Sequence, residues 1–252
     1  MLKSIDGRFE QRDFVHVINP TNTCLEVNVV NNPHVKFVAD SFSWPFRGDW
    51  KSTWLPGLIA VLLAPVAFIP LLGYAIAATR AAETDPTNSP PKWALSTRLF
   101  TDGFWTSLAV IVLTAPFAFA INPFAQRLYD AHLWNVSDVP LSQLYAHVLA
   151  TSILALPWGL LLLLHMPHAT ACFAHTGNPT DYIDFPSSIN AVRNDFATWN
   201  LAAAAIVTGW GIGLACVGLL CIGLVPGIFY AILVSAHATA VLEPKGKNPR
   251  AR

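Results

Sequence analysis

The histidines are the side chains whose chemistry stands out, because four of them lie in or beside long apolar runs. His147 lies near the start of one run and His237 near the end of the last, while His165 and His168 follow a run three residues apart. An imidazole at membrane depth can ligate a haem iron or the magnesium of a chlorophyll-type pigment, which needs one axial ligand and an apolar slot. We therefore consider these four as pigment or haem ligands, with interfacial or packing histidines as the alternative.

No dedicated metal site is predicted from these histidines. A metal site needs convergent neutral imidazoles with hydrogen-bonded support. Pro167 disturbs the helix between His165 and His168, and no carboxylate lies on the same face. No cofactor is required by the sequence, although a pigment or a lipid is compatible with it.

Catalytic residues are not predicted either. Ser, Cys and Asp occur, but no nucleophile elbow, phosphate-binding glycine loop or zinc-peptidase pattern accompanies them. The apolar runs also lack an ionisable residue near their middle, where an ion-coupled transporter normally places one. Lys and Arg total 15 and Asp and Glu total 15, so no basic field favours a nucleic acid. We predict a non-enzymatic protein with no nucleic-acid partner.

The elements that carry these residues are predicted to be membrane helices. Hydrophobic residues make up 54% of the 252 residues and charged residues only 12%, against about 25% charged in soluble proteins. Five runs lack Asp, Glu, Lys and Arg and approach the roughly 20 residues that cross a bilayer as a helix. These runs are 55–79, 104–121, 145–164, 199–222 and 224–242.

The first run contains three prolines, of which Pro65 and Pro70 interrupt its middle. If it enters the membrane and returns as two half-helices hinged near Pro65 to Pro70, fourteen of the fifteen basic residues fall on one side, and only Arg127 falls on the other. If it crosses, the two sides are nearly equal. Because basic residues collect on the cytoplasmic side, we predict four spans plus a re-entrant hairpin, with both termini cytoplasmic. A single kinked span is the alternative.

The connecting segments predict two interfacial amphipathic helices. One begins at Pro91 and carries Trp93 and Phe100, and the other begins at Ser187 or Ser188 and runs as far as Trp199. Small residues with a four-residue spacing let helices approach closely, either within the chain or between subunits. This pattern is formed by Gly209, Gly213, Gly223 and Gly227.

The chain divides into three parts. Residues 1–43 form a soluble arm in which β-prone runs at 13–19, 24–30 and 35–38 predict short strands. Residues 44–242 form the polytopic membrane domain, and residues 243–252 a basic cytoplasmic tail. The predicted fold class is therefore an all-α integral membrane protein with four transmembrane helices, a Pro-broken re-entrant hairpin, interfacial helices and a small β-containing arm.

From residue 43 to about residue 242 the chain resembles the prokaryotic membrane family called domain of unknown function 4013. The resemblance lies in the order and spacing of several short motifs. They are Trp44-Pro45-Phe46, Asp49-Trp50, Pro70 with Gly73-Tyr74 and Arg80, Pro91-Lys92-Trp93, Asp102-Gly103, Ala174 to Gly177, and the segment from Ser187 to Asn194. The family usually has an acidic residue where Lys92 stands, and a shorter amino terminus. The resemblance implies an architecture and no activity.

The role that these features favour is interaction. We expect an accessory or scaffold subunit of a larger membrane complex, respiratory or photosynthetic, with other membrane-protein subunits and lipids as partners. Its location would be a prokaryotic plasma membrane or an internal energy-transducing membrane. The predicted docking anchors are Trp44, Trp50, Trp93 and Trp199. Two alternatives stay open: a small-solute transporter or channel-like protein, and a chlorophyll-binding antenna or reaction-centre-associated subunit.

Overall fold

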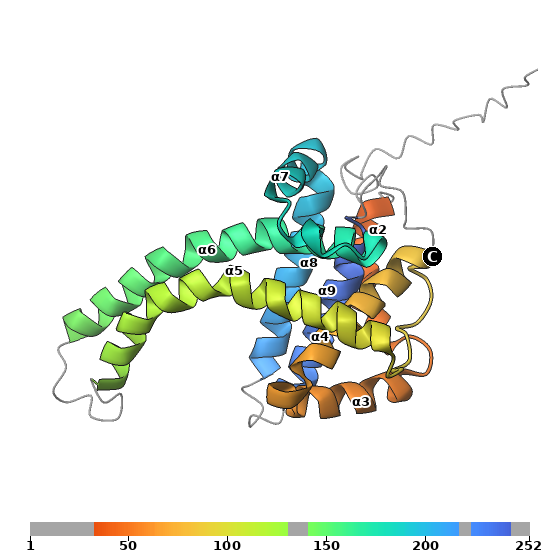
Figure 1. The fold of residues 1–252 in the computed structure, drawn as a ribbon, viewed down its shortest axis with the longest axis horizontal. Helices are drawn as coiled ribbons and strands as arrows, with labels where there is room; N and C mark the ends of the chain where they lie inside the picture. Colours follow the sequence, from red (N-terminus) through yellow and green to blue (C-terminus); the bar gives the residue numbers. More distant parts are fainter. Residues whose placement is uncertain (1–32, 131–140, 217–222, 243–252) are drawn as a thin grey trace, which may run out of the picture.

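The computed structural model describes residues 33–130, 141–216 and 223–242, and these residues contain helices and loops but no strand (Figure 1). The strand predicted at 35–38 is wrong, because Pro33–Asp40 forms helix α2. Phe37 of α2 stacks on His237, and such a tertiary contact readily overrides the β preference of valine. The β-prone runs at 13–19 and 24–30 lie outside the described residues.

The first apolar run folds as a hairpin of two helices, α3 (Trp50–Leu62) and α4 (Ala64–Thr84), separated only by Leu63. Trp93 ties the two helices together, because its indole donates to the Thr53 carbonyl on α3 at 3.0 Å and its ring stacks on Tyr74 of α4. The run therefore turns back on itself between two helices, whereas its re-entry within the membrane stays a prediction. The break precedes the predicted hinge because Pro65 occupies the first turn of α4, where a missing N–H costs little.

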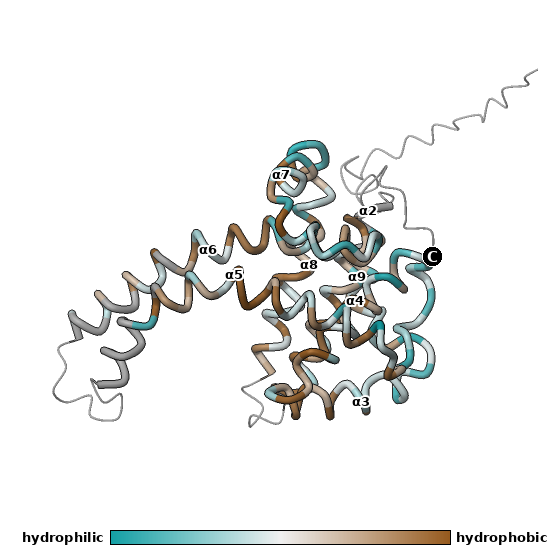
Figure 2. The backbone as a smooth tube through the Cα atoms, viewed as in Figure 1, coloured by the Kyte–Doolittle hydropathy of each residue, from teal (hydrophilic) through white to brown (hydrophobic). Residues whose placement is uncertain are grey.

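Hydrogen bonds connect several helix ends and loops, which we together call the polar end. They are α2, the start of α3, the 85–96 loop, the end of α6 (Leu141–Thr176), the 3₁₀ turn η2 (Pro179–Tyr182), α7 (Phe185–Asn194) and the end of α9 (Leu224–Ala240). The indole of Trp44, in the 3₁₀ turn η1 (Trp44–Phe46), donates to the carbonyl of Asn88 at 2.7 Å, and that of Trp93 donates to the carbonyl of Thr53 at 3.0 Å. The loops of this end are mostly hydrophilic (Figure 2).

Helices α5 (Thr97–Asp130) and α6 (Leu141–Thr176) run side by side away from the other helices (Figure 1). With 34 and 36 residues, each is about 50 Å long at 1.5 Å per residue. The separate interfacial helix predicted from Pro91 is wrong, since residues 89–96 are not helical. Ser96 ends that loop, and its hydroxyl oxygen accepts the N–H of Leu99 and caps α5.

The second predicted interfacial helix is present as α7 (Phe185–Asn194), but its cap is Asp184, whose carboxylate accepts the N–H of Ser187 at 3.1 Å. It ends sooner than predicted. Asp195 caps the next helix, α8 (Phe196–Ala215), which therefore includes Trp199. Helix α9 (Leu224–Ala240) packs along α8.

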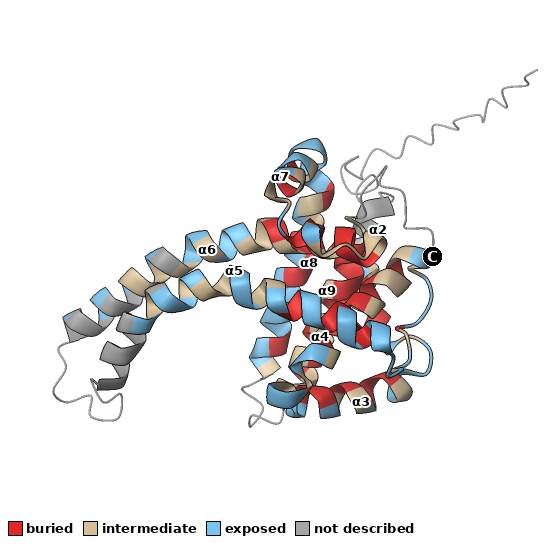
Figure 3. Cartoon of the chain, in the orientation of Figure 1, coloured by how far each residue is buried: buried red, intermediate tan, exposed pale blue. Residues whose placement is uncertain are grey.

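Among the described residues, four helices are long and apolar enough to cross a membrane: α4, residues 97–119 of α5, residues 149–176 of α6, and α8. The chain is thus an all-α protein with four candidate membrane-spanning helices. The set of candidate spans differs from the predicted one. It includes α4, and it does not include α9, whose 17 residues are too few for a candidate span. Buried side chains concentrate where α4, α8 and α9 meet the ends of α5 and α6 (Figure 3).

Candidate functional site

A buried histidine fastens α6 to the short elements at the polar end. The Nδ1 atom of His165 lies 2.9 Å from the hydroxyl of Ser188 on α7, and its Nε2 atom lies 2.9 Å from the carbonyl of Tyr182 in η2 (Pro179–Tyr182). The ring stacks on Phe185 with the centroids 3.9 Å apart. We call these four residues the α6 lock.

A second histidine repeats the arrangement on α9. The Nδ1 atom of His237 lies 2.8 Å from the hydroxyl of Ser41, just after α2, and its Nε2 atom lies 3.2 Å from the carbonyl of Pro86. Its ring stacks on Phe37 at 4.5 Å. In this set, the α9 lock, a serine hydroxyl, a loop carbonyl and an aromatic ring again hold one buried imidazole.

The hydrogen-bond partners determine which ring atoms are protonated. A backbone carbonyl can only accept, so Nε2 of both His165 and His237 must donate a hydrogen. A neutral ring then accepts the serine O–H at Nδ1, and a charged ring would carry hydrogen at both nitrogens. Both side chains are fully buried. Neither ring keeps a lone pair for a metal or a pigment magnesium, which favours a packing role for these two histidines.

An arginine clamp joins α4, α5 and α6. The guanidinium of Arg80 donates to the carboxylate of Asp102 at 3.1 Å and to the carbonyl of Ala174 at 2.9 Å, and the two charged side chains are only 14% and 12% exposed. Ala174 is in the last turn of α6, whose carbonyls have no partner within the helix. Arg98 approaches the same carboxylate at 3.7 Å. Arg80 therefore pairs a buried charge and caps a helix.

Tyr182 connects the clamp to the α6 lock. Thr106 donates to the carbonyl of Asp102 at 2.8 Å, so the Tyr182 hydroxyl, 3.0 Å away, must donate to Thr106. Burial raises the pKa of the Tyr182 hydroxyl far above its usual value, which keeps this donor protonated. The Tyr182 carbonyl in turn receives the His165 hydrogen bond. The site is a continuous network that fixes helix positions.

The 85–96 loop is shaped by its first residue. The carboxylate of Asp85 accepts the N–H and hydroxyl of Thr87 at 2.9 and 2.6 Å and the side-chain amide of Asn88 at 2.9 Å. These donors lower the pKa of Asp85. The turn presents the carbonyls of Pro86 and Asn88 to the α9 lock and to Trp44.

The other two candidate ligands are placed differently. His168 is buried, and its Nε2 atom lies 3.4 Å from the sulfur of Cys172, one turn further along α6. The side chain of His147 lies outside the described part of the chain. Across residues 33–130, 141–216 and 223–242, no three His, Cys, Asp or Glu side chains converge as metal ligands would.

The four tryptophans separate into two groups. Trp44 is fully buried, and Trp93 stacks on Tyr74 at 4.2 Å. Because Trp44 packs inside the molecule, the prediction that it anchors a partner is wrong. Trp93 is half-buried, and its docking role stays a prediction. Trp50 is 43% exposed and Trp199 is half-buried, and for these two the docking role stays a prediction.

The glycines serve contacts within the chain. A side chain at Gly209 would meet Val234, and one at Gly213 or Gly227 would meet the backbone of the other, so this spacing packs α8 on α9. Gly223 lies against the carbonyl of Cys216. We therefore favour the intramolecular interpretation for all four glycines.

The sequence analysis missed a second crossing of the same kind. Gly73 of α4 and Gly103 of α5 lie against each other's backbones, so any side chain at either position would collide with main-chain atoms. It also missed the pairing of Arg80 with Asp102, although opposite charges flanking successive apolar runs were a usable signal. The sequence carried no signal for the contact of Ser41 with His237, because 196 residues separate the two.

These features define a multi-pass helical membrane protein whose buried polar groups hold helix ends together. Residues 57–224 match the family model described as protein of unknown function (DUF4013), and the chain belongs to that family. No curated protein and no solved structure matches the chain.

Proposed function

We propose that the protein is an accessory or scaffold subunit that binds other membrane proteins through α6 and its neighbour α5. The observation that carries the proposal is the exposure of large apolar side chains on the part of these helices that extends beyond the bundle (Figure 3). Exposed fractions of 60 to 72% occur at Leu149, Ile153, Leu156 and Leu160, and of 56 to 79% at Ile111, Val112 and Phe119.

The spacing on α6 supports a protein partner in addition to lipid. Leu149 and Leu156 are seven residues apart, as are Ile153 and Leu160, which is the repeat of a helix–helix seam. Gly159 lies beside them, and a side chain there would meet nothing within 4 Å. A small residue among branched ones provides the hole into which a facing side chain packs.

The orientation in the membrane is part of the proposal. Every basic residue of the described helix ends and loops, apart from Arg127, belongs to or adjoins the polar end, which supports a cytoplasmic polar end with both termini on that side. The membrane would be a prokaryotic plasma membrane or an energy-transducing one. A reporter that fluoresces only in the cytoplasm should be active when fused after Arg252 and inactive when inserted after Asn135.

The test is purification from native membranes in a mild detergent. We expect a larger complex for the wild-type chain and loss of its partners in the variant with alanine at 149, 153, 156 and 160. A matched control carries alanine at Leu55, Ile59, Leu62 and Val66, which are equally apolar and exposed on α3 and α4, and should keep the partners. A wild-type chain that runs alone and conducts solutes in liposomes would contradict the proposal and support the transporter alternative.

The pigment alternative is decided with the same material. A chlorophyll or haem ligand would give strong visible absorption, and His147 and His168 would be the residues to replace first, since His165 and His237 have no free ring nitrogen. A featureless visible spectrum removes this alternative.

A further inference from the structure

Two segments at the polar end combine exposed cations with exposed apolar side chains. The start of α3 contributes Trp50 and Lys51, and the segment leading into α5 contributes Lys92, Leu95, Arg98 and Phe100. Trp50 is 43% exposed, Leu95 80% and Phe100 46%, and all three basic residues are exposed. We call these six residues the basic collar.

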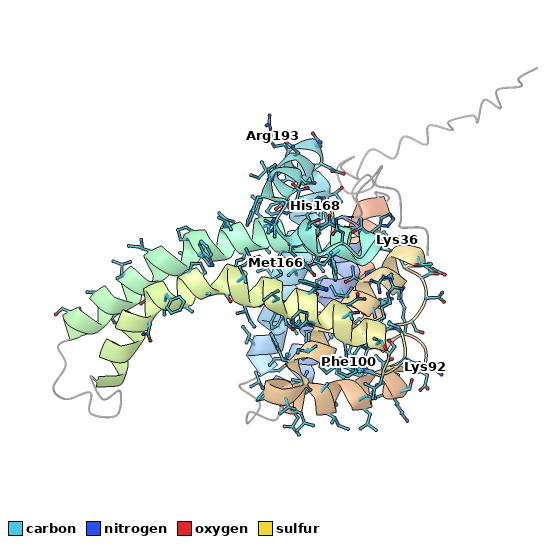
Figure 4. All side chains as sticks on the ribbon, in the orientation of Figure 1. Lys36, Lys92, Phe100, Met166, His168 and Arg193 are labelled. Atoms are coloured by element: carbon cyan, nitrogen blue, oxygen red, sulfur yellow. The ribbon has the colours of Figure 1, made fainter. Side chains whose placement is uncertain are left out.

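Hydrogen bonds hold the two segments together. The indole of Trp93 donates to the Thr53 carbonyl on α3 at 3.0 Å, and the hydroxyl of Tyr74 donates to the Pro91 carbonyl at 2.8 Å. Since its neighbours Pro91 and Trp93 are fixed against α3 and α4, Lys92 is held on the outside of the same region. Lys92 and Phe100 both lie in the lower right part of the view in Figure 4.

The start of the second segment's helix is fixed in the same way. Leu99 is 6% exposed and packs in the core, whereas its chain neighbours Arg98 and Phe100 are exposed. The start of α3 likewise buries Trp54 and leaves Trp50 and Lys51 exposed, so each segment anchors its exposed residues through a buried apolar side chain. The arrangement is held by the fold and does not depend on a flexible loop.

The position along the chain places the collar at the membrane boundary. No Asp, Glu, Lys or Arg occurs between residues 52 and 79, directly after Lys51, or between 103 and 126, directly after the start of α5. Charged side chains are costly inside the hydrocarbon and are favourable at its edge. The surroundings of the collar are therefore lipid headgroups.

The local charge favours anionic headgroups. The exposed carboxylate next to Lys51 is Asp49, and Arg80 and Arg98 share the buried carboxylate of Asp102. Together with Lys92, the basic side chains therefore outnumber these two carboxylates. The region around α7 is different, because Asp195 follows Arg193 two residues further along the chain. Arg193 and Lys36 also lie away from Lys92 (Figure 4).

We propose that the basic collar binds anionic phospholipids. The two ammonium groups and the guanidinium contact the headgroup phosphates, and Trp50, Leu95 and Phe100 lie among the upper parts of the acyl chains. The inference is independent of the subunit role proposed above, since it concerns lipid and a different surface from α6.

The test uses the full chain reconstituted in phosphatidylcholine vesicles that contain spin-labelled phosphatidylglycerol or spin-labelled phosphatidylcholine. Electron paramagnetic resonance gives the fraction of each lipid immobilised on the protein and hence their relative association constants. We expect phosphatidylglycerol to be preferred. Each of Lys51→Gln, Lys92→Gln and Arg98→Gln should lower the preference by up to about fivefold, and 0.5 M salt should lower it in the wild type.

The matched control is the double variant Lys36→Gln and Arg193→Gln, which removes exposed cations outside the collar and should keep the preference. No preference in the wild type, or an equal loss in the control, overturns the proposal. So does a triple collar variant that keeps the lipid preference but loses a protein partner from native membranes, because the collar would then bind an acidic protein. Circular dichroism of each variant establishes that it is folded.

Discussion

The bundle formed by α3, α4, α8 and α9 and the pair formed by α5 and α6 have similar apolar compositions but different packing. In the bundle, Gly213 and Gly227 bring the backbones of α8 and α9 together and His237 fastens the end of α9. Gly103 and His165 do the same for α5 and α6 where the pair meets the bundle. Beyond Gly103, the α5 and α6 pair has exposed side chains along most of its length. Apolar composition thus takes a helix into lipid, but small residues and paired polar groups determine which helices pack together.

The largest expected effect comes from Gly73→Leu at the crossing of α4 and α5. The new side chain would collide with the carbonyl of Leu99, and a backbone cannot move aside as a flexible side chain does. We expect destabilisation well above about 3 kcal/mol and little folded protein by gel filtration. Gly159→Leu on the exposed face of α6 is the matched control and should be folded like the wild type. If Gly73→Leu and Gly159→Leu were equally well folded, the bundle and the exposed part of α6 would not differ in how tightly they pack.

Breaking the arginine clamp should have the next largest effect. Arg80→Met leaves the Asp102 carboxylate and the Ala174 carbonyl without their main partner. We expect the free energy of unfolding to fall by about 3 kcal/mol, and by less if Arg98 moves closer to Asp102. The melting temperature in detergent measures it. Asp40→Asn, which breaks the exposed pair of Asp40 with Arg47, should cost less than about 1 kcal/mol. A clamp variant as stable as this control would show that the pair contributes nothing.

The α6 lock and the α9 lock should lose similar amounts of stability when their serine is replaced. Ser41→Ala and Ser188→Ala each leave one Nδ1 atom of a buried imidazole unsatisfied, which costs about 1 to 3 kcal/mol. Ser43→Ala, at an exposed hydroxyl, should change the stability by less than about 0.5 kcal/mol. Thermal unfolding of the three variants compares them directly. A large difference between the two locks would show that their common geometry does not give a common strength.

The smallest effect on stability is expected on the exposed face of α6. Alanine at 149, 153, 156 and 160 removes side chains that are 60 to 72% exposed. The melting temperature in detergent should therefore change little, and the free energy of unfolding by less than about 1 kcal/mol. Thermal unfolding checks this separately from partner binding. A marked destabilisation would mean that these residues belong to the core, and would also weaken the proposed docking surface.

Much of the architecture could be read from the sequence because lipid imposes simple rules. Charge-free runs predicted the long helices, and the prolines predicted that the first run is broken, which it is at Leu63. The boundaries were less accurate, since α5 and α6 extend well past their apolar runs. Helices begin where a residue can cap the first turn, as Ser96 does for α5 and Asp184 for α7. Hydropathy says little about such hydrogen bonds.

The candidate site was predictable only in its residue types. His165 and His237 were recognised as the polar groups at membrane depth, but their partners Ser188 and Ser41 were not, because a serine is common and its contact is made by folding. The same holds for Trp44, whose aromatic character suggested a surface role that its complete burial rules out.

The sequence by itself determined that this chain is helical and apolar enough to cross a membrane, since a bilayer leaves backbone groups no partner outside the helix. Only the tertiary structure decided which helices pack, which histidines are fastened and which apolar faces stay exposed. The physical reason is that hydropathy depends on one residue at a time, whereas close approach and hydrogen-bond satisfaction depend on atoms that are far apart in the chain.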